Sequence, residues 1–508
     1  MEPLDLLIAH GRVVDPQNHR DAALNIGIAA GRIAYVGTEL PTAQTVIDAT
    51  GKIVAPGFID LHSHAQDLAG HRLQALDGVT TSLELEGGAT PVAASYAWSQ
   101  SEGRPLHYGY SAGWLYARAI IKEQLDDAAI AALPSLPLEA FSALQQGTAW
   151  AEPATAEELP RIIDLVEAQL DAGALGIGVL LGYAPRTEPE ELRALGELAT
   201  RRSVPLFVHI RWGARVPGHT PVEAIEELIA LSRQTGARVH ICHFASSNAS
   251  TVEASSRALL AAQDEGLPVT TESYPFGLAS TVIGAEFLAP ESLEAAGAPA
   301  HIVTYLKTGE NISSYQRLAE LRAADPGGLC VIRYYDEAEP DQLDDLTQAL
   351  SLPGAAFASD AMVVQQLAEN TNGAPADVTQ WPLPDHGLTV HPRTTSCFVR
   401  AIAWLHRDTA TLSLSDVIER STAIPARILA DAVPPMRDKG HLGPGADADV
   451  VVFDLNALRP NTSFVPVTPS AGVDHVLVAG TPVVSHGALQ PEHRPGEPVY
   501  TTASTHTR

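Results

Sequence analysis

Apolar segments and helix-like segments alternate through the middle of the chain. Eight short apolar segments recur between residues 53 and 360, and most are separated by stretches with the spacing of an amphipathic helix, such as residues 157–173 and 189–203. Parallel strands need crossover connections of about this length, so the alternation predicts repeated strand–helix units. Eight such units fit an α/β fold of the TIM-type (β/α)8 barrel class, whose functional residues lie at the carboxyl ends of the strands.

Both ends of the chain instead contain only short strand-like segments punctuated by glycine. We expect residues 1–55 and 435–508 to pair into one small composite β-sandwich domain, although two separate β appendages would leave a similar pattern. Residues 56–434 would then form the barrel domain. The stretch around residues 277–353 is too long for a simple crossover, so we expect an insert there that crosses the barrel mouth.

The amino-acid composition excludes some classes of binding partner. The chain has 508 residues and a formal charge of −28, which repels nucleic acid and anionic membranes. It begins without a signal-like region and has no apolar run of about 20 residues, so we expect a cytoplasmic protein with no membrane partner. A small-molecule substrate fits this composition, and so does a homo-oligomer. The three cysteines form no CxxC pair, which excludes a disulfide framework and a thiolate zinc knuckle.

Polar residues with metal-binding chemistry end several of the apolar segments. The first segment ends in His62 and His64, which share one face of a strand because side chains alternate. Three later segments end in His209, His243 and Asp360. Barrel topology would bring all five to one mouth, where nitrogen and oxygen ligands suit zinc or another divalent first-row metal. The sequence therefore predicts a metal-dependent enzyme.

These motifs resemble those of the amidohydrolase superfamily of metal-dependent hydrolases. The resemblance rests on VAPGFIDLHSH, on the later strand-end histidines, on FASDAM and on GADADVVVFD near the carboxyl end. Within the superfamily, the chain is most similar to the D-aminoacylase (N-acyl-D-amino-acid deacylase) group. That match is carried by the segments PGFIDLHSH, GVTT, LGYAP, VHIRWG, HPR, AIPARIL and GPGADADVVVFD. The resemblance implies one or two zinc ions, with His209 and His243 on the tighter site and His62 and His64 on a second.

The bridging ligand differs from the family pattern. Many superfamily members bridge two metals with a carboxylated lysine, but none of the four lysines here ends a predicted barrel strand. D-aminoacylases use a cysteine after strand two, and this chain has Glu84 and Glu86 there instead. We expect Glu86 to be the replacement ligand, able to bridge, with Glu84 supporting it or the two roles reversed. Alternatively, both glutamates belong to a buried structural layer.

The resemblance also implies roles around the metals. Asp360 would be the general base that takes a proton from the attacking water, or it would serve only as a ligand. The D-aminoacylase group usually has a lysine two residues after the strand-six histidine, where this chain has Ala245. We expect Arg211, Arg393 or Arg333 to bind the substrate carboxylate instead, with Tyr183 donating a hydrogen bond.

The resulting prediction is an amidohydrolase that cleaves the linear amide bond of N-acyl amino acids, with N-acyl-D-amino acids favoured. One alternative keeps the barrel but changes the substrate to a cyclic amide, as in hydantoinases and dihydropyrimidinases, or to an isoaspartyl-type dipeptide. Those relatives generally use the carboxylated lysine that this chain lacks. A second alternative is a non-catalytic scaffold, which would be expected to lose metal ligands that are retained here.

Overall fold

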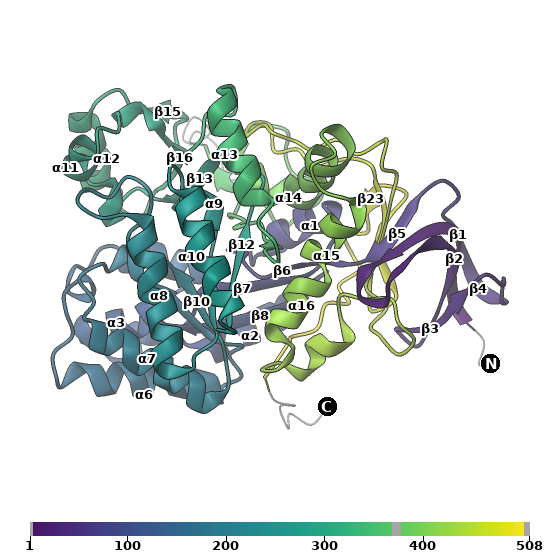
Figure 1. Cartoon of the computed structure of the whole chain (residues 1–508), viewed down its shortest axis with the longest axis horizontal. Helices are drawn as coiled ribbons and strands as arrows, with labels where there is room; N and C mark the ends of the chain where they lie inside the picture. Colours follow the sequence, from purple (N-terminus) through teal and green to yellow (C-terminus); the bar gives the residue numbers. More distant parts are fainter. Residues whose placement is uncertain (1–3, 368–376, 502–508) are drawn as a thin grey trace.

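In a computed structural model, which describes residues 4–367 and 377–501, eight parallel strands form the centre of the molecule (Figure 1). Neighbouring strands in the sheet follow one another along the chain, from β6 to β12 and then β17 after the insert. The strands are β6 (Phe58–Asp60), β7 (Val79–Ala89), β8 (His107–Gly113), β9 (Ile177–Leu180), β10 (Leu206–His209), β11 (Val239–Ile241), β12 (Val269–Ser273) and β17 (Ala356–Phe357). Each of the eight apolar segments contributes one strand, which confirms the predicted fold class.

The sheet closes into a barrel where its first and last strands meet. The Asp360 amide donates to the His62 carbonyl at 2.7 Å, and the His64 amide donates to the Ala361 carbonyl at 2.8 Å. Helices cover the outside of the barrel. They include α1 (Leu68–Leu76), α2 (Val92–Glu102), α3 (Trp114–Lys122), α6 (Glu158–Asp171), α7 (Pro189–Arg202), α8 (Pro221–Thr235), α10 (Val252–Asp264), α13 (Pro340–Leu350), α15 (Leu414–Ser421) and α16 (Ala423–Ala430).

A separate nine-stranded sheet combines both ends of the chain (Figure 1). Its strands are β1 (Leu4–Asp15), β2 (Arg20–Ala29), β3 (Arg32–Gly37), β4 (Ala43–Asp48), β5 (Ile53–Pro56), β20 (Val450–Phe453), β21 (Val473–Val478), β22 (Thr481–Ser485) and β23 (Ala488–Leu489). The two ends are joined at β5, which pairs with β1 on one side and with β20 on the other. Both termini therefore contribute to one sheet, as the predicted fold class expects.

A second antiparallel sheet follows β12 and lies over the barrel mouth. It has the order β13 (Leu278–Val282), β16 (Leu329–Arg333), β14 (Val303–Tyr305) and β15 (Glu310–Asn311), and it carries helices α11 (Pro290–Ala295) and α12 (Tyr315–Ala324). Residues of β13 and β16 line the cavity at the mouth. The insert therefore supplies one wall of any site there.

The opposite end of the barrel is closed by apolar packing. Leu61, Leu83 and Phe207 point into a buried cluster that also includes Val499 near the carboxyl end. The backbone of Val499 pairs with the barrel, because its amide donates to the Tyr108 carbonyl at 2.8 Å. Access to polar groups in the barrel is therefore from the mouth. None of the helices in the described ranges is long and apolar enough to cross a membrane.

Candidate metal centre

The five strand-end residues expected from the sequence meet at the barrel mouth, together with Glu86 of β7. Two of them sit in unusual backbone conformations, since φ is +35° at His243 and +50° at Asp360. Positive φ is uncommon for residues other than glycine, and such strain tends to persist where the surrounding structure fixes it for a function. These turns direct both side chains back over the barrel mouth.

The first group of potential ligands consists of Glu86, His209 and His243. One oxygen of the Glu86 carboxylate, Oε1, lies 2.7 Å from His243 Nε2 and 3.0 Å from His209 Nδ1. The two imidazole nitrogens are only 2.9 Å apart. Three potential metal-ligand atoms, one from each residue, thus converge on one point.

The second group consists of His62, His64 and Asp360. Their inward atoms are also close, because His62 Nε2 lies 3.3 Å from His64 Nε2 and 3.6 Å from Asp360 Oδ1. The other Glu86 oxygen, Oε2, lies 3.2 Å from His62 Nε2. Glu86 therefore presents one oxygen to each group, which is the arrangement of a bridging carboxylate.

The orientation of the imidazoles fits a cation at the second group. His62 Nδ1 lies 2.6 Å from a Glu272 oxygen, and His64 Nδ1 lies 2.7 Å from a Glu84 oxygen. Pairing of the outer nitrogen with a carboxylate is the usual way to fix a metal-binding histidine and leave its inner nitrogen free. The two inner nitrogens, 3.3 Å apart, can be held together by a shared proton or by a cation between them. The donor set therefore fits a divalent metal.

The electrostatics of the cluster point the same way. Burial lowers the pKa of His62, but the carboxylates of Glu86 and Asp360 raise it well above its ordinary value. Burial raises the pKa of Glu86, but His62 and His243 hold it well below its ordinary value. Burial lowers the pKa of His64 and Glu84 raises it, with a net value of about 10. The cluster therefore attracts positive charge strongly, as a cation site must.

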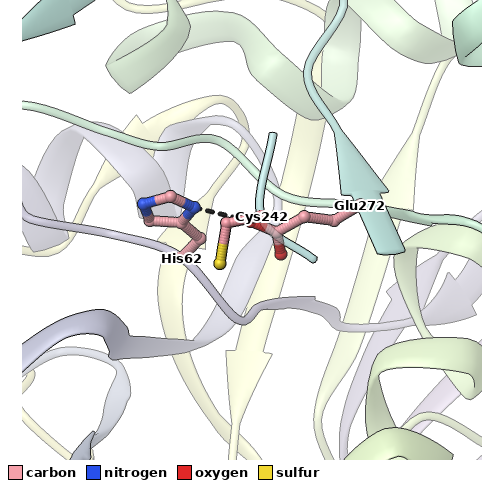
Figure 2. A group of neighbouring side chains, drawn as sticks. All are labelled: His62, Cys242 and Glu272. Carbon is pink, nitrogen blue, oxygen red and sulfur yellow. Dashed lines mark hydrogen bonds and ion pairs between the residues drawn. The ribbon is translucent and has the colours of Figure 1, made fainter. Parts of the chain in front are cut away.

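The structure reveals a supporting carboxylate that the sequence analysis missed. Glu272, on β12, contacts His62 through one oxygen (Figure 2). Its other oxygen lies 3.1 Å from His240 Nε2. His240 lies behind the site with its other nitrogen on Thr270, as a structural histidine would. Cys242 lies beside His62 and Glu272, and the three could form a further ligand group. Burial raises the pKa of the Cys242 thiol well above its ordinary value, so we treat it as a neutral neighbour.

Glu84 takes the supporting role rather than the central one. Besides contacting His64, it accepts hydrogen bonds from the backbone amides of Gly87 and Gly88 at 3.1 and 3.3 Å. These bonds anchor the carboxylate to the end of its own strand. The geometry therefore favours Glu86 over Glu84 as the shared ligand.

The predicted substrate arginines differ in their surroundings. Arg211 lines the mouth cavity, but Glu227 accepts from its Nε and Nη2 atoms, and the carbonyls of Pro185 and Thr187 accept from Nη1. Arg393 is fully buried, and its Nη2 lies 2.7 Å from Asp360 Oδ1. Its Nε and Nη1 atoms have no hydrogen-bond partner among the described residues. Arg393 thus keeps unused donors close to the metal groups, whereas Arg211 does not.

Tyr183 and Tyr274 complete the polar wall of the cavity. The Tyr183 hydroxyl hydrogen-bonds to Thr281 of the insert at 2.5 Å, and its ring lies 5.1 Å from that of His209. The Arg393 guanidinium lies over the Tyr274 ring at 4.7 Å, and the buried Tyr274 hydroxyl has no partner within the described ranges. Tyr274 is a second residue that the sequence analysis overlooked, and its place just beyond strand seven was the available signal.

Two family models match this chain, and both describe the amidohydrolase family. One matches residues 45–283, which include most of the potential ligands, and the other matches residues 387–483. The chain belongs to the amidohydrolase family. This conclusion agrees with the resemblance seen in its strand-end motifs.

Several relatives of this amidohydrolase match nearly its full length. It is 28% identical to an N-acyl-D-glutamate deacylase of Alcaligenes xylosoxydans xylosoxydans, over 97% of this chain and 96% of that protein. It is 26% identical to a D-aminoacylase of the same organism, over 97% of each. Among solved structures, an N-acyl-D-glutamate deacylase of Bordetella bronchiseptica, complexed with zinc and a phosphonate inhibitor, superposes with a TM-score of 0.73 at 24% identity. That superposition covers 98% of this chain and all of the other and supports the shared fold.

Proposed function

We propose that this amidohydrolase cleaves the linear amide bond of N-acyl amino acids and acts on N-acyl-D-amino acids. The observation that carries the proposal is Glu86, which presents one oxygen to each of two histidine groups at the barrel mouth. The two deacylases that match almost the whole chain support the choice of substrate class over cyclic amides.

The residues that would hold metal follow from the geometry. Glu86, His209 and His243 would bind one ion, and His62, His64 and Asp360 would bind a second, with Glu86 shared between them. Zinc suits these nitrogen and oxygen ligands, although another divalent first-row metal is compatible with them. When bound, such an ion lowers the pKa of a water molecule and polarises the amide carbonyl.

Asp360 is the residue placed to move the proton. Burial raises its pKa, but Arg393 and His62 lower it below its ordinary value, so the carboxylate is ionised at neutral pH. An ionised carboxylate at the mouth can accept the proton of the attacking water and return it to the leaving nitrogen. One proton then enters and leaves Asp360 in each turnover, and the products are a carboxylic acid and a free amino acid.

The α-carboxylate of the substrate would be held on the side of the mouth formed by β12 and β17. Two buried nitrogens of Arg393, Nε and Nη1, have no partner among the described residues, and the Tyr274 hydroxyl, on a residue that lines the mouth cavity, is also unpaired there. Unsatisfied buried donors are costly, and a carboxylate would compensate them. Tyr183 would donate to the substrate from the opposite wall when its bond to Thr281 opens.

A substrate panel tests the proposal. The zinc-loaded protein is expected to hydrolyse N-acetyl-D-amino acids faster than their L-enantiomers, and to leave hydantoins and β-aspartyl dipeptides intact. Release of free amino acid is the direct measurement. A metal-loaded, folded protein that cleaves none of the N-acyl amino acids would show that the proposal is wrong.

A further inference from the structure

A second cavity opens beside the metal groups, and its chemistry differs from that of the main cavity. Both cavities touch His64 and Glu86, and Tyr183 and Thr281 stand between them. The rest of the second cavity is mostly apolar. We define the acyl arm as the part lined by Tyr116, Leu138, Phe141, Leu180, Val282 and Met362.

We propose that the acyl arm binds the acyl chain of the substrate and selects uncharged chains longer than acetyl. This inference rests on the proposed function, because it names the acyl group of the same reaction. It is carried by the position of the arm next to Glu86 and by the character of its lining.

The lining has no charge apart from the metal groups. Its six side chains are all buried, and the two tyrosines that border it stay neutral because burial raises the pKa of both well above the ordinary value. A carboxylate entering the arm would lose its hydration and meet no lysine or arginine among the six side chains that define the arm. A methylene chain would instead gain from leaving water.

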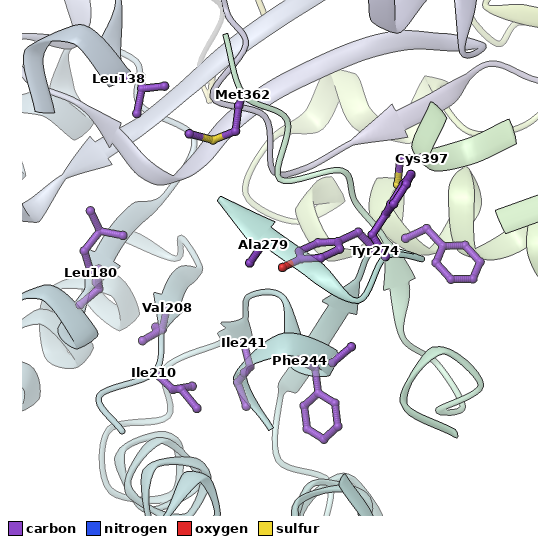
Figure 3. Packing of buried hydrophobic residues seen from close by; sticks show 14 of the residues in the cluster. Leu138, Leu180, Val208, Ile210, Ile241, Phe244, Tyr274, Ala279, Met362 and Cys397 are labelled. Carbon is purple, nitrogen blue, oxygen red and sulfur yellow. The ribbon is translucent and has the colours of Figure 1, made fainter. Parts of the chain in front are cut away.

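The position of the arm fixes which end of the substrate it receives. Leu180 ends β9, and Tyr116 lies in α3, which follows β8, so the arm lies over that part of the barrel. Arg393 and Tyr274 lie across the mouth, beside β12 and β17. Figure 3 shows Leu138, Leu180 and Met362 on one side and Tyr274 on the other. The amino acid carries the carboxylate, so binding it near Arg393 leaves the acyl chain pointing into the arm.

Leu138 sets the length of the arm. It belongs to α5 (Pro137–Leu144) and also borders a neighbouring surface cavity that contains Leu136 and Val363. A smaller side chain at this position would join the two spaces, whereas a larger one would shorten the arm. Ser142, on the same helix, borders only the neighbouring cavity and provides a matched control.

The test compares one D-amino acid carrying formyl, acetyl, propionyl, butyryl, hexanoyl or succinyl groups on the zinc-loaded protein. Each methylene that enters the arm is expected to raise kcat/KM about fourfold, because its burial is worth about 0.8 kcal/mol. Succinyl is expected to fall at least roughly tenfold below butyryl, because its carboxylate would be buried unpaired. Leu138→Phe should remove the gain from propionyl and butyryl but retain formyl turnover, and Leu138→Ala should move the optimum to longer chains.

The outcomes separate the two proposals. A flat or falling series from formyl to butyryl, or equal rates with succinyl, would overturn the acyl arm and leave the deacylase function standing. Changes in the preferred amino acid without changes in the acyl series in the Leu138 variants would also overturn it. Ser142→Ala should behave as the parent does, and an altered acyl series in that variant would count against Leu138 as the determinant. No turnover with any acyl group would instead reject the proposed function.

Discussion

Replacing Glu86 with glutamine is the sharpest test of the metal centre. The change preserves the shape of the side chain but removes the negative charge that lies 2.7 to 3.2 Å from three imidazole nitrogens. Removing one partner from a buried charged cluster typically costs about 3–5 kcal/mol. Expressed as a change in the zinc dissociation constant, this corresponds to a loss of affinity of roughly 10²- to 5 × 10³-fold.

The assay is competition for zinc with a chromophoric chelator, together with metal content after dialysis. Both ions should bind more weakly, because each histidine group loses one Glu86 oxygen. Glu84→Gln is the matched control, since it lies on the same strand but contacts only His64 among the candidate ligands. We expect a loss of about 10- to 100-fold there, as for other groups that orient a metal-binding histidine. Equal zinc affinity in Glu86→Gln and the parent would refute the bridging role, and a larger effect in Glu84→Gln would reverse the two assignments.

The remaining predictions concern proton transfer, histidine orientation and stability. Asp360→Asn should lower kcat by at least about 10²-fold at nearly unchanged content of the tighter metal, and retained turnover would exclude the base role. Glu272→Gln should weaken zinc binding by about 10- to 100-fold through His62, and unchanged affinity would show that the contact is incidental. Asp449→Asn should cost roughly 3 kcal/mol at neutral pH, because Asp449 pairs with buried Lys439 at 2.7 Å. Lys439 and His107 lower the pKa of Asp449 despite burial, so this stability is fully present above about pH 4 and is lost progressively as the pH falls below that value. Unfolding of both proteins at pH 3 and 7 should show the gap closing, and a constant gap would contradict the pairing.

The barrel could be predicted from the sequence because its signal is repeated. Each of the eight strands is a short apolar segment, and helices of similar length separate most of them. A single misread segment would not have changed the predicted fold class. The pairing of the two termini could also be predicted, because both carry the same short, glycine-punctuated strands. The strand order inside the insert could not be predicted, because its four strands are short and pair out of sequence.

The metal groups were largely predictable, but their supports were not. Strand periodicity places His62 and His64 on one face, and the barrel then brings them to His209 and His243. Glu272 sits inside a predicted strand segment but was not singled out by the sequence analysis, and only the structure shows that it contacts His62. The contact between Arg393 and Asp360 could not be predicted either, because the two residues lie 33 positions apart and share no strand. Contacts of this kind depend on tertiary packing, which a local pattern does not encode.

The carboxylate at position 86 changes which metal ions the proposed site would accept. A thiolate is a soft ligand that favours zinc and copper(I), whereas a carboxylate is hard and also accepts manganese and cobalt. Each Glu86 oxygen already faces its own histidine group, so the bridge needs both atoms of the carboxylate and not the single atom that a cysteine would offer. Glu86→Cys would therefore reproduce the chemistry of a thiolate bridge but not the span of this one. If both ions bind as proposed, the spacing of the two groups suits a carboxylate that offers one oxygen to each of them, and a sequence scarce in lysine and cysteine would still hold a complete metal centre.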